Sequence, residues 1–203
     1  MTIEAWLAFC ATELVLCFTP GPAVLLVVSV ALGRGMRGGL SAALGILTAN
    51  TLYFALSAFG IGAVLVASHE LFLAVKWAGA LYLVVLGLRM IFERSASRGD
   101  EAVAPLPHGF ARGFVVQGAN PKSLIFFTAL LPQFLDPTAG MAVQVAILGV
   151  SSVLIEIVAL AVYAFAASRA RRFARGAWIS RIEAVGGAFL VAAGLCLAVS
   201  DAD

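Results

Sequence analysis

The chain has 203 residues, of which 62% are apolar and 12% are charged, and its formal net charge is +2. Soluble domains are about 45–50% apolar and roughly 25% charged, so this composition excludes a soluble enzyme, a nucleic-acid-binding protein and a disordered linker. The mean hydropathy of +1.04 instead indicates an integral membrane protein that crosses the lipid bilayer several times. We expect a single transmembrane domain, residues 1–203, with all-α structure.

Six apolar stretches are long enough to cross a bilayer, which takes about 20 residues per helix. The N-terminal residues lack a basic region and include Glu4, so we expect the first stretch to be retained rather than cleaved as a signal peptide. Five spans with one re-entrant segment are the main alternative. The six predicted transmembrane helices are 5–32, 39–67, 71–92, 113–135, 141–168 and 182–200.

The basic residues alternate between the two ends of these spans. The connections after spans two and four hold Glu70 and Asp136, with Lys76 close by. By the positive-inside rule, the arginine-rich connections are cytoplasmic and both termini lie on the outer side. All eleven arginines fall near the connections after spans one, three and five: Arg34, Arg37, Arg89, Arg94, Arg98, Arg112, Arg169, Arg171, Arg172, Arg175 and Arg181.

A polar cytoplasmic loop at 93–112 separates a first half, 1–92, from a second half, 113–203, each with three spans. Because three is odd, halves that share a fold must be inverted in the membrane. Each half opens with a span that proline interrupts, and such interruptions in corresponding positions indicate a transporter binding site. We therefore predict two inverted three-helix repeats with Pro-broken first and fourth helices.

The first interruption is the run Thr19, Pro20, Gly21 and Pro22. Its prolines remove backbone donors and clash with the preceding turn, so the helix must kink or break there. A half-helix that begins near Gly21 would offer free N–H groups and a positive dipole end to an anion. The alternative is a kinked helix with no binding role, because proline kinks are common in membrane spans.

The second interruption is Asn120, Pro121 and Lys122, with Gln117 nearby. Pro121 suits the first turn of a new half-helix, and the Asn120 side chain can cap it by accepting a free N–H. Lys122 adds a positive charge inside a span. It either contacts the substrate or a gate, or extends its ammonium to the cytoplasmic interface.

Two carboxylates lie inside predicted spans, Glu13 and Glu156. A charged residue at a helix centre costs roughly 3 kcal/mol on insertion scales, so each must face the bundle interior or water, pair with a cation such as Lys122, or stay protonated. Glu13 lies seven residues before Pro20, on the same face of a continuous helix. A carboxylate that takes up and releases a proton could couple transport to a gradient. The alternative is a protonated, hydrogen-bonded core acid.

Span two carries a polar patch that includes Asn50 and Tyr53, although such residues often bond only to a neighbouring helix. The sequence holds none of the HExxH, GxSxG or P-loop patterns, and we expect no enzyme activity, cofactor or metal site. We predict that Glu156 and Glu13 couple protons. The predicted substrate-binding residues are Thr19, Pro20, Gly21, Pro22, Asn50, Tyr53, Gln117, Asn120, Pro121 and Lys122.

Several motifs in the same order resemble the LysE/RhtB family of bacterial inner-membrane amino-acid exporters. They are TPGP, RGMRGGLSAALGI, KWAGALYLVVLGLRM and GANPKSLIFFTALLPQFLDP, followed by VLIEIVALAVYA and GGAFLVAAG. The resemblance covers nearly the whole chain. One departure is Ala23 directly after TPGP, where many members carry a polar residue. The family positions that the chain matches are Pro20, Gly21, Pro22, Asn120, Pro121, Lys122 and Glu156.

The resemblance implies efflux of a small amino acid or analogue, driven by the proton-motive force. The expected partners are this substrate, protons and the lipid bilayer, and the small-residue helix faces permit a homodimer. A cation or metal exporter is the main alternative, although two carboxylates without histidine are few ligands for a transition metal. A structural or assembly protein would not need two acids inside its spans. An intramembrane hydrolase would need an Asp pair or a Ser–His pair there.

Overall fold

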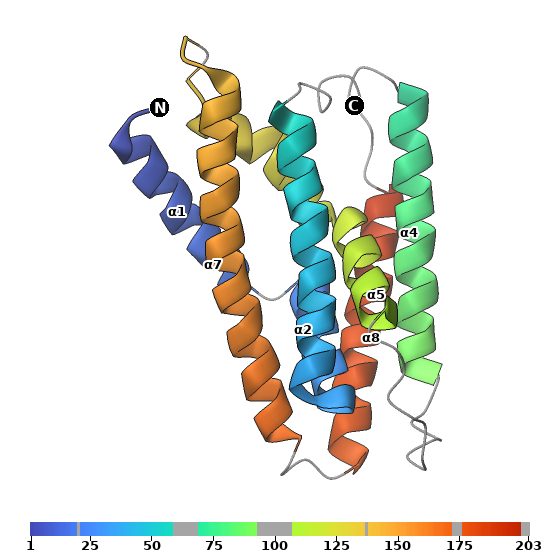
Figure 1. The fold of residues 1–203 in the computed structure, drawn as a ribbon. Coiled ribbons are helices and arrows are strands. Elements are labelled where there is room, and N and C mark those ends of the chain that lie inside the picture. The colour runs from blue at the N-terminus through green and yellow to red at the C-terminus, as the bar shows by residue number, and fades with distance from the viewer. Residues whose placement is uncertain (20, 59–68, 93–106, 137, 172–175, 200–203) are drawn as a thin grey trace.

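The computed structural model describes residues 1–19, 21–58, 69–92, 107–136, 138–171 and 176–199 (Figure 1). These ranges are helical apart from short connections and contain no strand. The elements are α1 (Ile3–Phe18), α2 (Pro22–Ala58), α4 (His69–Phe92), α5 (Pro107–Gly118), α6 (Pro121–Ile125), the π-helix η1 (Phe126–Leu130), the 3₁₀-helix η2 (Leu131–Phe134), α7 (Met141–Ala170) and α8 (Gly176–Val199).

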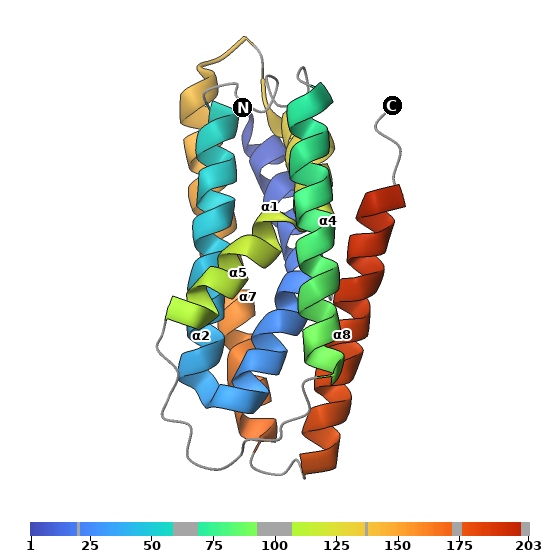
Figure 2. The ribbon, with the colours of Figure 1, turned by 90° about the vertical axis from the view of Figure 1, so that its right-hand side faces the viewer.

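The helices run mostly along one long axis (Figures 1 and 2). Helix α2 makes its most extensive contacts with α7 and α5, and α4 packs against α8. Helix α1 packs against α7, and the Trp6 indole N–H donates to Ser151 Oγ over 3.0 Å. The N-terminus of α1 and the C-terminal end of α8 lie toward the same end of the bundle (Figure 1).

The predicted first span, 5–32, is broken as its prolines require. Helix α1 ends at Phe18 and α2 begins at Pro22, so the break predicted at TPGP is confirmed. Because α1 stops at Phe18, Glu13 and Pro20 do not share a continuous helix, and Pro20 itself lies outside the described residues.

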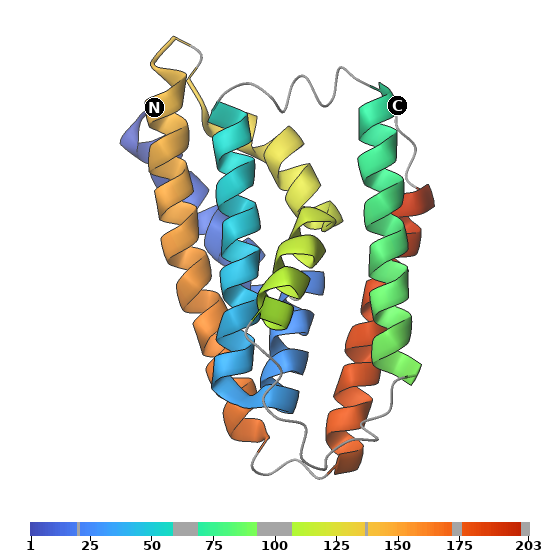
Figure 3. The same ribbon diagram turned by 45° about the vertical axis from the view of Figure 1, so that its right-hand side comes forward.

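Helix α2 contains a second change of direction, at Gly35. Its backbone there is non-helical, with φ 75° and ψ −171°, a left-handed φ that glycine adopts without the Cβ penalty. The chain turns back at this point, so the two parts of α2, 22–34 and 36–58, run alongside each other (Figure 3). The turn falls between the predicted spans one and two.

The fourth predicted span, 113–135, is also divided. Helix α5 ends at Gly118 and α6 begins at Pro121, after which the chain continues as π-helix and 3₁₀-helix to Phe134. Helix α5 starts at Pro107, inside the predicted loop 93–112. This correction has a physical reason, because proline at the first helical position loses no hydrogen bond.

The backbones of α2 and α5 touch at two glycines. A Cβ on Gly45 would lie 2.0 Å from the Phe110 carbonyl oxygen, and one on Gly113 would lie 2.0 Å from the Ala42 carbonyl oxygen. No side chain larger than hydrogen fits at such distances. This close approach brings Asn50 on α2 within hydrogen-bond reach of α5.

Helix α7 is apolar toward the outside and partly polar toward the inside. The stripe Val143, Val150, Leu154 and Val158 is exposed by 60–65%, whereas Glu156 on the opposite face is buried. A soluble helix shows the reverse pattern, so an apolar exterior fits contact with lipid.

By length and composition, two of the described helices could cross a membrane: α2, over Pro22–Ser57, and α7, over Met141–Ala170. Helix α4 covers the predicted span 71–92, and α8 begins six residues before the predicted span 182–200. The span 39–67 is helical as far as Ala58, and its remainder lies outside the described residues. The six-span count and the inverted repeat remain predictions.

Candidate functional site

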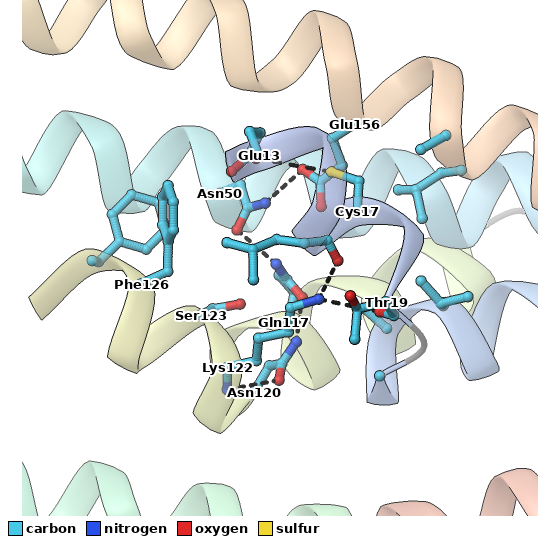
Figure 4. Close-up of a pocket in the computed structure, with 17 residues that line it drawn as sticks. Glu13, Cys17, Thr19, Asn50, Gln117, Asn120, Lys122, Ser123, Phe126 and Glu156 are labelled. Carbon is cyan, nitrogen blue, oxygen red and sulfur yellow. Dashed lines mark hydrogen bonds between the residues drawn. The ribbon is translucent and has the colours of Figure 1, made fainter. Parts of the chain in front are cut away.

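A cavity of about 70 Å³ lies between the two helix breaks. About 10–15 Å³ is enough for one water molecule, so a cavity of this size has room for more than one and for a small solute. Polar side chains from α1, α2, α5, α6 and α7 converge on it (Figure 4). They are Glu13, Cys17, Thr19, Asn50, Gln117, Asn120, Lys122, Ser123 and Glu156.

Both predicted intramembrane acids face this cavity. Glu13 and Glu156 are only 6% and 7% exposed, which confirms that they point into the bundle. Glu13 Oε1 accepts a hydrogen bond from Ser152 Oγ at 2.6 Å, and Cys17 Sγ lies 4.0 Å from the same oxygen. Glu156 Oε2 accepts from Asn50 Nδ2 at 2.5 Å. Each acid is thus held by a neutral donor from another helix.

Three amide side chains connect Glu156 to the second helix break. Asn50 Oδ1 accepts from Gln117 Nε2 at 2.7 Å, and Gln117 Oε1 accepts from Asn120 Nδ2 at 3.0 Å. Asn120 Oδ1 in turn accepts the backbone N–H of Lys122 at 3.1 Å. The predicted N-cap of α6 by Asn120 is therefore confirmed.

Lys122 forms no ion pair with a carboxylate in the described parts of the chain. Its ammonium donates to the carbonyl oxygens of Leu16 and, at 3.2 Å, Thr19, so it caps the C-terminal end of α1 from across the cavity. The one ion pair among the described residues joins the N-terminal ammonium of Met1 to Asp136 Oδ2 at 3.7 Å. Neither of the two roles predicted for Lys122 included this capping of a helix C-terminus.

The remaining predicted site residues divide into two groups. Thr19 and Gly21 line the cavity. Pro22, Tyr53 and Pro121 do not; Pro22 and Pro121 begin helices, and the Tyr53 hydroxyl donates to the Gly118 carbonyl oxygen at 2.6 Å. Tyr53 therefore stabilises the second helix break without lining the cavity.

Several residues that line the cavity, and Ser152, which donates to Glu13 beside it, were not predicted from the sequence. Cys17 follows Glu13 by four residues, and Ser152 precedes Glu156 by four, so each pair shares a helix face. That spacing is the signal that could have found them. Phe126 and Phe127 also line the cavity and belong to the π-helix η1, whose conformation has no sequence signature.

The two sides of the cavity differ in charge. In Figure 4, Glu13 and Glu156 lie on one side, and Lys122 and Thr19 lie on the other. Ala23 and Val24, which line the cavity at the beginning of α2, carry backbone N–H groups in its first turn. Such an arrangement can bind a small zwitterion by both of its charges. Within the described parts of the chain, no three His, Cys, Asp or Glu residues come together to hold a metal ion.

Helices with apolar side chains turned outward around a buried polar cavity are typical of a helical membrane protein. The chain belongs to the LysE type translocator family, which it matches over residues 14–201.

Its relatives include proteins named for efflux. The chain is 31% identical over 178 residues to the homoserine/homoserine lactone efflux protein of Salmonella typhimurium, covering 87% of this chain and 86% of that one. It is 32% identical over 123 residues to the leucine efflux protein of Salmonella choleraesuis, covering 59% and 58% of the two chains. It is also 31% identical, over the full length of both chains, to an uncharacterized membrane protein of Vibrio cholerae. No solved structure matches the chain.

Proposed function

We propose that the protein is a secondary active exporter that moves small amino acids or analogues out of the bacterial cytoplasm in exchange for protons. The observation that carries the proposal is the small cavity between two broken helices, with an ammonium on one side and two carboxyl groups on the other. The names of two relatives, which give homoserine, homoserine lactone and leucine as efflux substrates, support the substrate class.

The substrate carboxylate binds on the Lys122 side of the cavity. Among the described residues, the Lys122 ammonium donates to the carbonyl oxygens of Leu16 and Thr19. An ammonium has three N–H donors, so a third can bind a ligand. The N–H groups of Ala23 and Val24 lie at the positive end of the α2 dipole. A carboxylate there gains a charge-assisted hydrogen bond as well as a favourable dipole.

The substrate ammonium binds on the opposite side, beside Glu156 and Glu13. A proton and the substrate ammonium compete for the negative charge of the same carboxylate, so Glu156 does not bind both at once. Protonation of Glu156 from the outside therefore releases the substrate, and loss of that proton to the cytoplasm restores the binding site. This cycle gives proton/substrate antiport by alternating access.

The membrane arrangement in this proposal has six spans, with the arginine-rich connections in the cytoplasm and both termini in the periplasm. It is supported by the common direction of the N-terminal end of α1 and the C-terminal end of α8 (Figure 1). The helix breaks after α1 and after α5 occupy corresponding places in the two halves, which supports an inverted repeat.

The test is efflux from proteoliposomes loaded with a mixture of amino acids that includes homoserine and leucine, with and without an imposed pH gradient. We expect selective, gradient-dependent loss of one or a few of them. Glu156→Gln should abolish the gradient dependence, because glutamine cannot exchange a proton. Full proton-coupled efflux by Glu156→Gln would contradict the coupling role, and loss of no amino acid from intact protein would favour a cation exporter.

A further inference from the structure

The three amides between α6 and α7 form a hydrogen-bond chain with a fixed direction (Figure 4). Asn120, Gln117 and Asn50 each donate to the next acceptor toward Glu156, over 3.0, 2.7 and 2.5 Å. All three side chains are buried, with exposed fractions of 3–6%. The chain begins at the Lys122 backbone N–H and ends at Oε2 of Glu156.

The beginning of the chain sets the orientation of every amide in it. A backbone N–H can only donate, so the oxygen of Asn120 must face Lys122 and its nitrogen must face Gln117. Each amide has one oxygen and one nitrogen, so the same choice is forced on Gln117 and then on Asn50. Asn50 therefore presents N–H donors to Glu156 and offers no acceptor there.

This direction makes the two oxygens of Glu156 unequal. A proton on Oε2 would face the Asn50 nitrogen, donor against donor. If Asn50 rotated to accept that proton, Gln117 and Asn120 would have to rotate too, and the nitrogen of Asn120 would then face the Lys122 N–H. A proton on Oε2 thus either costs a buried hydrogen bond or leaves Asn50 donating to a hydroxyl oxygen, which accepts more weakly than a carbonyl oxygen, whereas a proton on Oε1 keeps Oε2 as the carbonyl acceptor and leaves the hydrogen-bond chain intact.

Resting on the proposed coupling role of Glu156, we propose that Asn120, Gln117 and Asn50 form a one-way chain that reserves Oε2 as an acceptor and directs the transported proton to Oε1. Gln117, in the middle of the chain, is then a positioning residue. The ionisable groups around Glu156 are Glu13 and Cys17 from α1 and Lys122 from α6. The hydrogen-bond chain also keeps the start of α6 capped whether or not Glu156 carries a proton.

The first test is the pH profile of efflux from proteoliposomes loaded with homoserine and leucine. Gln117→Met keeps the length of the side chain but removes its hydrogen bonds, so Asn50 becomes free to rotate and accept a proton on Oε2. The protonated form gains that hydrogen bond, and the midpoint of the pH profile should move to higher pH by about 0.5–1 unit.

The matched control is Tyr53→Phe, which removes a hydrogen bond at the same helix break but outside the chain. We expect its midpoint to stay at the wild-type pH. A Gln117→Met midpoint equal to that of the wild type, or an equal shift in both variants, would overturn the proposal.

A second measurement needs no substitution of the three amides, so it remains possible even if Gln117→Met fails to fold. Infrared difference spectra of the wild type at high and low pH report the C=O stretch of protonated Glu156, which the Glu156→Gln spectrum assigns. The proposal predicts a lowered C=O frequency, because the carbonyl is then Oε2 and accepts from Asn50. A frequency typical of a carbonyl without a hydrogen bond would overturn it. If Glu156→Gln instead leaves gradient-dependent efflux unchanged, the coupling role fails, and this band still decides where the proton binds.

Discussion

The two helix breaks differ in the side chains that satisfy their exposed backbone groups. At the second break, Asn120 caps α6 locally, by accepting an N–H only two residues away. At the first break, the carbonyl oxygens at the end of α1 are bound by Lys122, which is 106 residues from Leu16 in the sequence. The start of α6 is therefore capped by its own segment, whereas the end of α1 combines local bonds from the Thr19 N–H with a long side chain that reaches across the cavity.

This difference indicates which break responds to a ligand. A carboxylate bound by the third N–H of Lys122 also draws the ammonium away from the carbonyl oxygens of Leu16 and Thr19, because a charged acceptor binds it more strongly than a neutral one. We expect substrate binding to loosen the end of α1 and to leave the capped start of α6 in place.

Lys122→Met removes the one side chain that serves both the end of α1 and, in our proposal, the substrate. We expect efflux to fall at least about 100-fold, equivalent to about 2.7 kcal/mol, as lost hydrogen bonds to a charged group would predict. The measurement is initial efflux from proteoliposomes. Lys122→Arg is the control that keeps the charge. Efflux by Lys122→Met at the wild-type rate would show that the first break does not depend on this residue.

Gly113→Ala separates α5 from α2 without touching the first break. The new Cβ would lie 2.0 Å from the Ala42 carbonyl oxygen, and such overpacking costs about 1–3 kcal/mol. The measurement is the thermal unfolding temperature in detergent. Gly118→Ala is a matched control on the same helix, since a Cβ there meets nothing within 4 Å. Equal stability of the two variants would contradict the close contact between α2 and α5.

Asn120→Ala removes the local cap of the second break. Loss of an N-cap costs about 1 kcal/mol, so the unfolding temperature should fall by about 2–4 °C. Asn120→Asp keeps the acceptor for the Lys122 N–H but cannot donate to Gln117, so it separates the cap from the amide chain. An unfolding temperature unchanged in Asn120→Ala would mean that the cap contributes nothing to stability.

The smallest effect is expected outside both breaks, at Asp136. Its side chain accepts hydrogen bonds from the Thr138 hydroxyl and backbone N–H, which lower the pKa of the carboxyl below its ordinary value. The folded state thus favours the charged form, so the stabilisation is present above the ordinary Asp pKa and is lost as the pH falls through the lowered value. Asp136→Asn should lower the unfolding temperature at pH 7 by no more than about 2 °C, and the difference should vanish near pH 2. A larger difference at low pH than at neutral pH would contradict this sign.

The sequence predicted the features that depend on local chemistry. The prolines predicted both helix breaks, and Asn120 predicted the cap of α6. The cost of inserting a carboxylate into a membrane predicted that Glu13 and Glu156 point inward. These features follow from backbone geometry or burial cost within a few residues. The helix bounds were predicted less well where a polar stretch also holds a proline that can begin a helix. In the predicted loop 93–112, Pro107 begins α5.

The features that depend on the packing of distant segments could not be predicted. The Lys122 contact with Leu16 and the order of Asn50, Gln117 and Glu156 are set by how α1, α2, α5 and α7 meet. A polar residue in an apolar span indicates an inward position but names no partner. The homodimer and the inverted repeat likewise remain predictions.

The most direct test of the proposed proton/substrate antiport is whether substrate efflux moves protons. Proteoliposomes would be loaded with homoserine and leucine and a pH-sensitive dye, at equal pH inside and outside. We expect the lumen to acidify as the amino acid leaves, and we expect Glu156→Gln to prevent the acidification. Efflux with no change in lumenal pH would contradict the claim that this cavity exchanges amino acids for protons.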